Sequence, residues 1–170
     1  VLSVHESVDL ADELIRMFRA RRLTLAGAES CTGGLLAKLL TDRPGASDVF
    51  AGGVVSYSNE VKKSLLHVSE EVLARCGAVS QETARAMLDG LAEAIPSDAA
   101  IALTGIAGPG GATVEKPVGL VYAGVRFQTQ TEIMELRLRG SRAQIRERAC
   151  AEAMFRLRKL VRKETRDEGK

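Results

Sequence analysis

The 170-residue chain has few of the residues that mark several common classes of protein. It contains no tryptophan, and aromatic residues make up 4% of it. Its three cysteines, Cys31, Cys76 and Cys150, are widely spaced and form no CxxC pair. The sequence therefore predicts neither a disulfide framework nor a zinc site. We expect a protein of the reducing cytoplasm.

The sequence also has few histidines, no long apolar run and a small net charge. The two histidines, His5 and His67, are expected to be surface or core residues rather than catalytic ones. No apolar stretch approaches the ~18 residues that span a bilayer, and no signal-peptide pattern is present. The net charge is +2, and the basic run from Arg137 to Lys163 contains Phe155 as its one aromatic residue. We expect that run to be a solvated helix face complementing acidic helices, with neither nucleic acid nor a membrane as partner.

Patterns typical of strands and helices alternate along the chain. Short apolar runs predict strands at 23–28, 50–57, 99–105, 118–127 and, as an exposed edge, 131–139. Helical spacing predicts helices at 7–20, 32–41, 59–66, 69–76, 80–94 and 141–162. This order predicts an α/β fold: a three-layer α/β/α domain with a mixed, mostly parallel sheet. We expect a single domain over 1–170, with 163–170 as a frayed tail.

Nearly all the unusual side chains fall in three loops that leave predicted strands, at 28–34, 56–62 and 104–111. Ligands of open α/β sheets bind outside the carboxyl ends of the strands. The sequence therefore predicts that the three loops form one site.

The first loop, "AESCTGG", fills a strand-to-helix turn with several polar and reactive groups. Free backbone N–H groups at the start of the next helix favour an anion, such as a phosphate or a developing oxyanion. Helix capping would explain one of the two hydroxyls, of Ser30 or Thr32. It does not explain Glu29, Cys31 and the two glycines as well. The motif is neither GxSxG nor GxxxxGK, which excludes a nucleophile elbow and a P-loop.

The second and third loops offer a base and exposed backbone. A serine nucleophile needs a base, and burial lowers the pKa of a lysine towards neutrality. "SYSNEVKK" provides Lys62 and Lys63, of which only one faces the site well, because adjacent helical residues point about 100° apart. The glycines of "TGIAGPGG" can bring bare amides against a ligand, although glycine-rich turns are often only turns.

Several ordered motifs together resemble those of one known family. The segments are "AESCTGG", "YSNEVKKSLLHV", "GAVSQETARAM", "LTGIAGPGG", "KPVGLVYAGV" and the late "GSR". They resemble the CinA C-terminal domain family over about residues 8 to 162. The resemblance implies a three-layer α/β/α fold. Enzymes of the family are nicotinamide-nucleotide amidases, similar to serine amidohydrolases with a Ser/Lys dyad and with no metal or cofactor. Longer relatives carry a separate N-terminal domain, and we do not expect the activities of that domain in this chain.

The resemblance also implies roles for individual residues. Ser30 is the implied nucleophile and Lys62 the base, with Tyr57 and Thr104 as further catalytic residues. The implied substrate-binding residues are Glu29, Thr32, Gly33, Gly34, Asn59, Gly105, Gly108 and Arg142. The implied reaction deamidates nicotinamide mononucleotide to nicotinic acid mononucleotide and ammonia through an acyl-enzyme. Amides of the first loop would hold the oxyanion; the glycine-rich loop and Arg142 would hold the phosphate. We expect a pyridine nucleotide as ligand, and a homo-oligomer with a dimer favoured.

Three alternatives remain open at this point. Cys31 is a second candidate nucleophile, because a helix N-terminus lowers the pKa of a thiol. The second alternative is a non-catalytic nucleotide-binding or competence/damage-associated module. The third is an oligomeric scaffold with a vestigial pocket. The presence of Ser30, Lys62, Tyr57 and Thr104 together favours catalysis.

Overall fold

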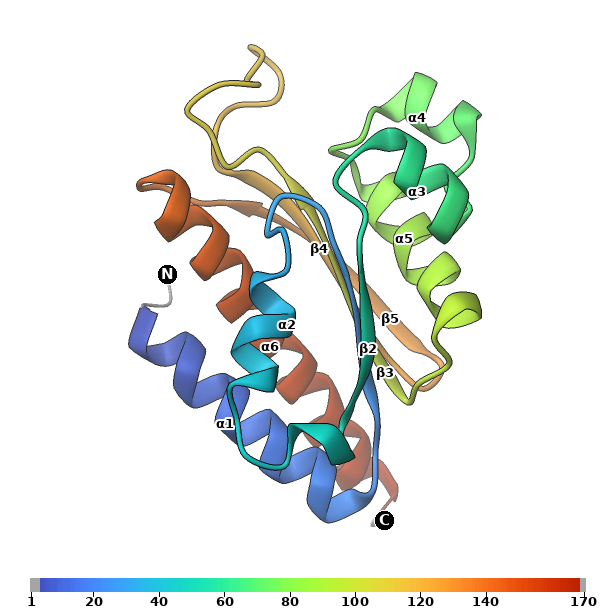
Figure 1. Cartoon of the computed structure of the whole chain (residues 1–170), viewed down its shortest axis with the longest axis vertical. Coiled ribbons are helices and arrows are strands. Elements are labelled where there is room, and N and C mark those ends of the chain that lie inside the picture. The colour runs from blue at the N-terminus through green and yellow to red at the C-terminus, as the bar shows by residue number, and fades with distance from the viewer. Residues whose placement is uncertain (1–3, 169–170) are drawn as a thin grey trace.

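The computed structural model describes residues 4–168, and within them a five-stranded sheet forms the middle of three layers (Figure 1). The strands are β1 (Leu25–Glu29), β2 (Phe50–Val55), β3 (Ala99–Gly105), β4 (Leu120–Phe127) and β5 (Gln130–Arg137). Their order is β2-β1-β3-β4-β5; β1 pairs in parallel with β2 and β3, whereas β3–β4 and β4–β5 are antiparallel. All the described strands except β4 therefore run the same way, which confirms the predicted mixed, mostly parallel sheet.

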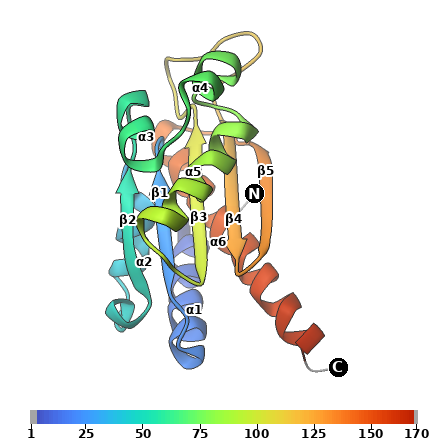
Figure 2. The same ribbon diagram turned by 90° about the vertical axis from the view of Figure 1, so that its right-hand side faces the viewer.

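Helices cover both faces of the sheet (Figures 1 and 2). One layer holds α1 (Val4–Arg21), α2 (Leu35–Thr41) and α6 (Arg142–Glu168), and a short 3-10 turn, Ala46–Asp48, precedes β2. The other layer holds α3 (Asn59–Leu66), α4 (Glu70–Cys76) and α5 (Gln81–Ala94). The side chains of Ser58, Ser69 and Ser80 cap the three helices of this second layer, each accepting a hydrogen bond from a backbone N–H of the first helical turn.

The two central strands are apolar on both faces because helices pack on each side. Successive strand side chains alternate between the faces. Ile101 and Leu103 of β3 therefore belong to the core shared with α1 and α6. Ala100 and Ala102 belong to the core shared with α5. Small residues on the α5 side let that helix lie close to the sheet.

A glycine also sets the distance between α5 and α3, the helix that carries Lys62. A methyl group on Gly90 would lie 1.8 Å from the carbonyl oxygen of Leu66, far inside van der Waals contact. The backbones of the two helices can approach this closely only because position 90 has no side chain.

Gly90→Ala is therefore expected to lower the free energy of unfolding by about 1–3 kcal/mol, as overpacking of a core does. Helix propensity alone predicts the opposite sign, since alanine in a helix interior is favoured over glycine by roughly 0.5–1 kcal/mol. Urea denaturation of both proteins measures the difference. An equally stable or more stable variant would mean that α3 is not held by this contact.

Three helix boundaries differ from the sequence prediction by three residues or more. The first helix, predicted from residue 7, begins at Val4. The helix predicted from residue 32 begins at Leu35, because Gly33 and Gly34 have φ values of 57° and 95°, which lie outside the right-handed helix. The last helix, predicted to end at 162, continues to Glu168. No glycine or proline interrupts the chain between Arg142 and that residue. Residues 169 and 170 of the predicted tail lie outside the described residues. The assignment of the whole chain to a single domain stays a prediction.

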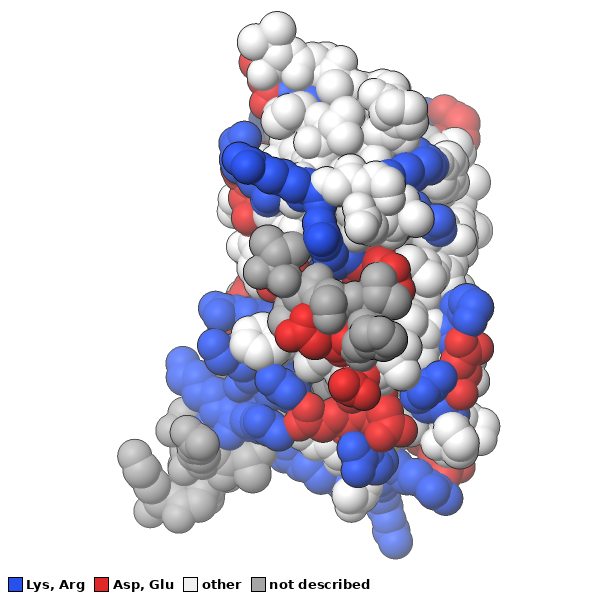
Figure 3. Space-filling view, turned by 90° about the vertical axis from the view of Figure 1, so that its left-hand side faces the viewer, with Lys and Arg blue, Asp and Glu red and all other residues white. Residues whose placement is uncertain are grey.

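Basic side chains of α6 pair with acidic side chains of α1 and β5. Arg158 and Arg162 both pair with Glu13 of α1, and Arg156 pairs with Glu132 of β5. Figure 3 shows basic and acidic side chains gathered next to each other on this side of the molecule. None of the helices described between residues 4 and 168 has the length and apolar character needed to cross a membrane.

Candidate active site

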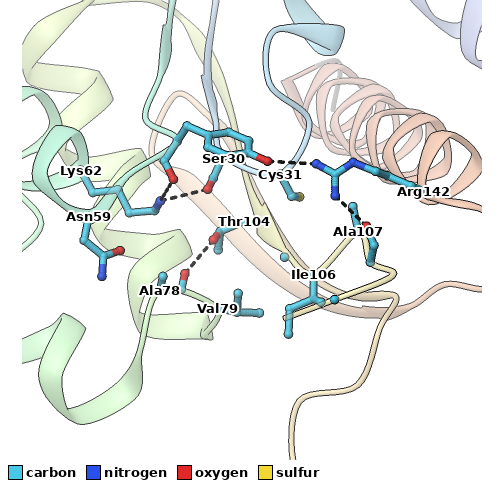
Figure 4. A pocket seen from close by; sticks show the side chains of 14 residues that line it. Ser30, Cys31, Asn59, Lys62, Ala78, Val79, Thr104, Ile106, Ala107 and Arg142 are labelled. Carbon is cyan, nitrogen blue, oxygen red and sulfur yellow. Dashed lines mark hydrogen bonds between the residues drawn. The ribbon is translucent and has the colours of Figure 1, made fainter. Parts of the chain in front are cut away.

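The three loops meet at the carboxyl ends of β1, β2 and β3, around a pocket of about 250 Å³ (Figure 4). The first loop contributes Ser30 and Cys31, and the second contributes Tyr57, Asn59 and Lys62. The rest of the lining is Ala78, Val79, Thr104, Gly105, Ile106, Ala107, Gly108, Gly110 and Arg142. The structure therefore brings together most of the predicted site residues, while Glu29, Thr32, Gly33 and Gly34 are not part of the lining.

Ser30 and Lys62 point toward each other across the pocket (Figure 4). Lys62 Nζ lies 2.9 Å from Ser30 Oγ, 2.7 Å from the carbonyl oxygen of Ser56 and 3.5 Å from that of Tyr57. The two carbonyl oxygens can only accept hydrogen bonds, so they fix two N–H groups of the amine. The third position of the nitrogen faces Ser30. In the neutral amine that position is a lone pair, which accepts the serine O–H.

Burial favours this neutral form. The Lys62 side chain is among the most deeply buried of the described residues, with 1% exposure. Its desolvation lowers the pKa of the amine below the usual 10.5, and a Cys31 thiolate would act in the opposite direction. Ser30 is 8% exposed and faces the pocket, so the pair combines a reachable hydroxyl with a base kept away from water.

The neighbouring lysine has the opposite environment. Lys63 Nζ lies 2.7 Å from both Glu60 and Glu70 on the outer side of α3. Hydrogen bonds to Glu60 and to Glu70 raise the pKa of Lys63, so this amine stays charged. Of the two lysines that the sequence left as candidates, the structure places only Lys62 beside the serine.

Cys31 lines the pocket but is unsuited to act as a thiolate. Burial raises the pKa of its thiol to about 12, and this effect exceeds the opposing ones from its own backbone N–H and from Arg146. A cysteine nucleophile reacts as the thiolate. The burial of the thiol, together with the contact between Ser30 and Lys62, therefore favours Ser30 as the nucleophile.

Glu29 acts as a cap at the start of α2, and its side chain is not part of the pocket lining. Its buried carboxylate accepts hydrogen bonds from the backbone N–H groups of Gly34, Leu36 and Ala37 at 2.9–3.1 Å. The amides at the start of α2, expected from the sequence to bind an anion, are therefore already bound to this carboxylate. A negative side chain is favourable at that end of a helix.

Glu29→Ala is expected to lower the free energy of unfolding by about 2–4 kcal/mol, because it leaves three backbone N–H groups without their acceptor in a buried region. Glu71→Ala provides a matched control: Glu71 is exposed in the first turn of α4 and pairs with Arg75. The control should change stability by less than about 0.5 kcal/mol. Urea denaturation measures both variants, and equal effects would contradict the capping role.

Arg142 joins three parts of the pocket rim. It donates from Nη1 to the carbonyl oxygen of Gly108 at 2.7 Å and from Nη2 to the hydroxyl of Tyr57 at 3.0 Å. Gly108 itself has a φ of 77°, and a methyl group there would lie 2.5 Å from Val118.

Thr104 uses its hydroxyl to donate to the carbonyl oxygen of Ala78 at 2.6 Å, which ties the end of β3 to the segment before α5.

One residue that the sequence did not single out holds the turn after Ser30. Arg146 donates from Nε to the carbonyl oxygen of Cys31 at 3.1 Å and from Nη2 to that of Thr32 at 2.5 Å. Its position four residues after Arg142 places it on the same face of α6, which is the only signal that the sequence carries. The hydroxyl oxygen of Thr32 is buried and has no hydrogen-bond partner in the described structure.

His67 does not contribute to the site. His67 is exposed at the C-terminal cap of α3, as expected for a surface residue. The side chain of His5 lies outside what the structure describes. No group of three or more His, Cys, Asp or Glu side chains that could hold a metal ion occurs in the described part of the chain.

The protein is thus an open α/β domain with a serine–lysine pair at the carboxyl ends of its parallel strands. The model of the CinA C-terminal domain matches residues 7–161. The chain belongs to this family, as its motifs predicted.

Relatives in sequence and in structure agree with this assignment. A CinA-like protein of Mycobacterium avium is 49% identical over 156 residues, which cover 88% of this chain and 36% of that protein. A CinA-like protein of Fusobacterium nucleatum is 47% identical over 144 residues, which cover 85% of this chain and 35% of that protein. The chain thus spans about a third of the length of these curated relatives. The competence/damage inducible protein CihA of Agrobacterium tumefaciens superimposes with a TM-score of 0.90 at 38% identity, covering 94% of this chain and 98% of that one.

Proposed function

We propose that the pocket hydrolyses a carboxamide by acyl transfer to Ser30, and that its substrate is nicotinamide mononucleotide. The observation that carries the proposal is the 2.9 Å contact between Ser30 Oγ and the buried amine of Lys62. A hydroxyl is a weak nucleophile unless a base takes its proton, and a desolvated lysine is such a base. The pyridine nucleotide follows from the family's enzymes and not from the geometry.

The chemical steps use these two side chains for every proton transfer. Neutral Lys62 takes the proton of Ser30 as its Oγ attacks the carboxamide carbon. The tetrahedral intermediate collapses, the C–N bond breaks, and the Lys62 ammonium gives its proton to the leaving nitrogen, which departs as ammonia. Lys62 then takes a proton from water, whose oxygen attacks the ester. The C–O bond to Ser30 breaks, the proton returns to the serine, and the carboxylic acid leaves.

The turn held by Arg146 is our candidate for the oxyanion site. Cys31 lines the pocket next to Ser30, and Arg146 holds the carbonyl oxygen of the same residue, so the backbone N–H of Cys31 is the candidate donor. No backbone carbonyl oxygen of the described residues accepts from this N–H. A positioned backbone donor of this kind is typically worth about 3–4 kcal/mol in the transition state. The N–H groups of Arg142 not used by Gly108 and Tyr57 are candidates for the substrate phosphate.

Asn59 supports recognition of a polar substrate group. Its side chain is exposed at the start of α3, lines the pocket beside Lys62 and has no hydrogen-bond partner in the described structure (Figure 4). Its amide is therefore available to a ligand. Gly105 and Gly108 border the same space and present backbone without a side chain. The cytoplasmic location and the homodimer stay predictions.

Incubation of the protein with nicotinamide mononucleotide tests the proposal. We expect equal amounts of ammonia and nicotinic acid mononucleotide, measured by a coupled assay and by chromatography. The rate should be unchanged after dialysis against EDTA, because the proposed steps use no metal. Binding of the nucleotide without release of ammonia would instead support a non-catalytic nucleotide-binding module.

A further inference from the structure

We propose that the ring of Tyr57 is the surface on which the flat ring of the substrate stacks. This inference deepens the proposed function, on which its choice of ligand rests. Tyr57 is the one aromatic residue among those that line the pocket in the described structure. Its side chain is 59% exposed, although its neighbours Ser56 and Lys62 are buried. A large exposed ring at the mouth of a polar pocket offers apolar contact area to a ligand.

The exposed ring is nevertheless held in place from several sides. Its hydroxyl accepts a hydrogen bond from Arg142, which is itself anchored on the Gly108 carbonyl. The ring also lies over the turn of the first loop, since a methyl group on Gly33 would be 3.9 Å from Cε2. A side chain that is ordered before the ligand arrives loses little conformational freedom on binding. This combination of exposure and fixed position is what a stacking platform requires.

The location of the ring matches the order of groups in the ligand. The backbone oxygen of Tyr57 contacts Lys62, beside the nucleophile, and its hydroxyl contacts Arg142, the candidate for the phosphate. The ring therefore lies between the positions proposed for the carboxamide and for the phosphate. The group between them in nicotinamide mononucleotide is a flat, positively charged pyridinium attached to ribose. An aromatic face attracts such a cation as well as stacking on it.

The same contacts assign the hydroxyl a positioning role. It accepts from Arg142, and no hydrogen bond joins it to Ser30 or Lys62 in the described structure. Tyr57 then contributes to catalysis by binding the ring and by offering its backbone oxygen to Lys62. Removal of the hydroxyl should accordingly matter less for ring binding than removal of the ring.

Tyrosine fluorescence gives a direct readout of ring stacking, because the chain has no tryptophan and only two tyrosines. The other, Tyr122, lies on β4 and donates to Glu135. In the double variant Ser30→Ala, Tyr122→Phe, the emission comes from Tyr57 alone and the ligand is not turned over. Titration with nicotinamide mononucleotide should quench this emission, whereas ribose 5-phosphate, which lacks the ring, should not. Binding of both ligands without selective quenching would overturn the inference.

Affinities of two variants in the Ser30→Ala background complete the test. By calorimetry, Tyr57→Leu should weaken binding of nicotinamide mononucleotide by about tenfold or more, as expected for loss of a stacked ring. The same change should weaken ribose 5-phosphate by less than about threefold, since only the hydrogen bond to Arg142 is lost there. Tyr57→Phe should retain most of the affinity for nicotinamide mononucleotide. Equal losses for both ligands, or no loss in Tyr57→Leu, would show that the ring does not stack.

These measurements separate failure of the inference from failure of the proposed function. If the wild-type protein releases no ammonia but the ring-selective quenching occurs, the stacking site stands and the amidase proposal falls. If ammonia is released and Tyr57→Leu binds the substrate as the parent does, the amidase proposal stands and the stacking site falls. Thermal melting of each variant confirms that it is folded, which is expected for a change at an exposed ring.

Discussion

Replacement of Ser30 by alanine is expected to abolish ammonia release from nicotinamide mononucleotide, lowering kcat by at least about 10⁴-fold, as loss of a serine nucleophile does elsewhere. The hydroxyl is the atom that forms the acyl-enzyme, and no other side chain reaches the same position on Lys62 in the described structure. Only one hydrogen bond is lost with it, so the free energy of unfolding should change by about 1 kcal/mol.

Cys31→Ala is the matched control for this change. Its thiol lines the same pocket one residue away and has a pKa raised to about 12 by burial, so its removal should leave much of the activity. Steady-state rates of both variants, with urea denaturation to confirm folding, provide the comparison. A dead Cys31→Ala beside an active Ser30→Ala would reverse the assignment and make the thiol the nucleophile.

Replacement of Lys62 is expected to have the second largest effect. Lys62→Met fills the space with an apolar side chain and removes the base, which should lower kcat by about 10²–10⁴-fold. Lys62→Arg should be as damaging, because a guanidinium does not lose its proton in proteins. Lys63→Met is the control, since Lys63 faces Glu60 and Glu70 instead of the pocket. Single-turnover rates decide between them. An active Lys62→Arg, or a folded but dead Lys63→Met, would refute Lys62 as the base.

The pH dependence should follow the lowered pKa of Lys62. The active amine is the neutral one, so the rate should be low at pH values below this pKa and should rise as the pH passes through it. The midpoint of that rise should lie below pH 10.5. Stability should report the same group without catalysis. Between the lowered pKa and 10.5 the unfolded chain binds the proton and the folded chain does not, so the free energy of unfolding rises with pH. Lys62→Met should flatten that rise. A rate that is flat with pH, or a midpoint at or above 10.5, would contradict a desolvated base.

Burial is the factor that makes this lysine a candidate base, and it depends on how α3 lies against the rest of the fold. The side chain of Lys62 enters the space between α3 and the ends of β1 and β2, where Ser56 and Tyr57 offer backbone oxygens. Gly90 allows α3 to approach α5 closely enough for this packing. The stability change expected for Gly90→Ala and the activity of Lys62 therefore both depend on the placement of α3 against α5.

Much of the fold could be predicted from the sequence because its signals are local. Apolar runs and helical spacing are set by neighbouring residues, and serine caps and glycine turns act within a few positions. The site's location followed from the rule that loops at the carboxyl ends of parallel strands converge. The start of α2 was misplaced because Thr32 resembles a cap, whereas the positive φ values of Gly33 and Gly34 delay the helix until Leu35.

Local sequence patterns were enough to predict the order of helices and strands and the three loops of the pocket. They also indicated Ser30, with a lysine in "NEVKK", as the candidates for its chemistry. The choice between Lys62 and Lys63 required the packed structure, since it depends on the rotation of α3 about its axis relative to the pocket. The packed structure also made Glu29 the cap of α2, and joined Arg142 to Tyr57 and Arg146 to Cys31. These contacts connect residues far apart in the chain. The physical reason is that hydrophobic periodicity is written locally, whereas hydrogen bonds and desolvation depend on which distant groups the packed layers bring together.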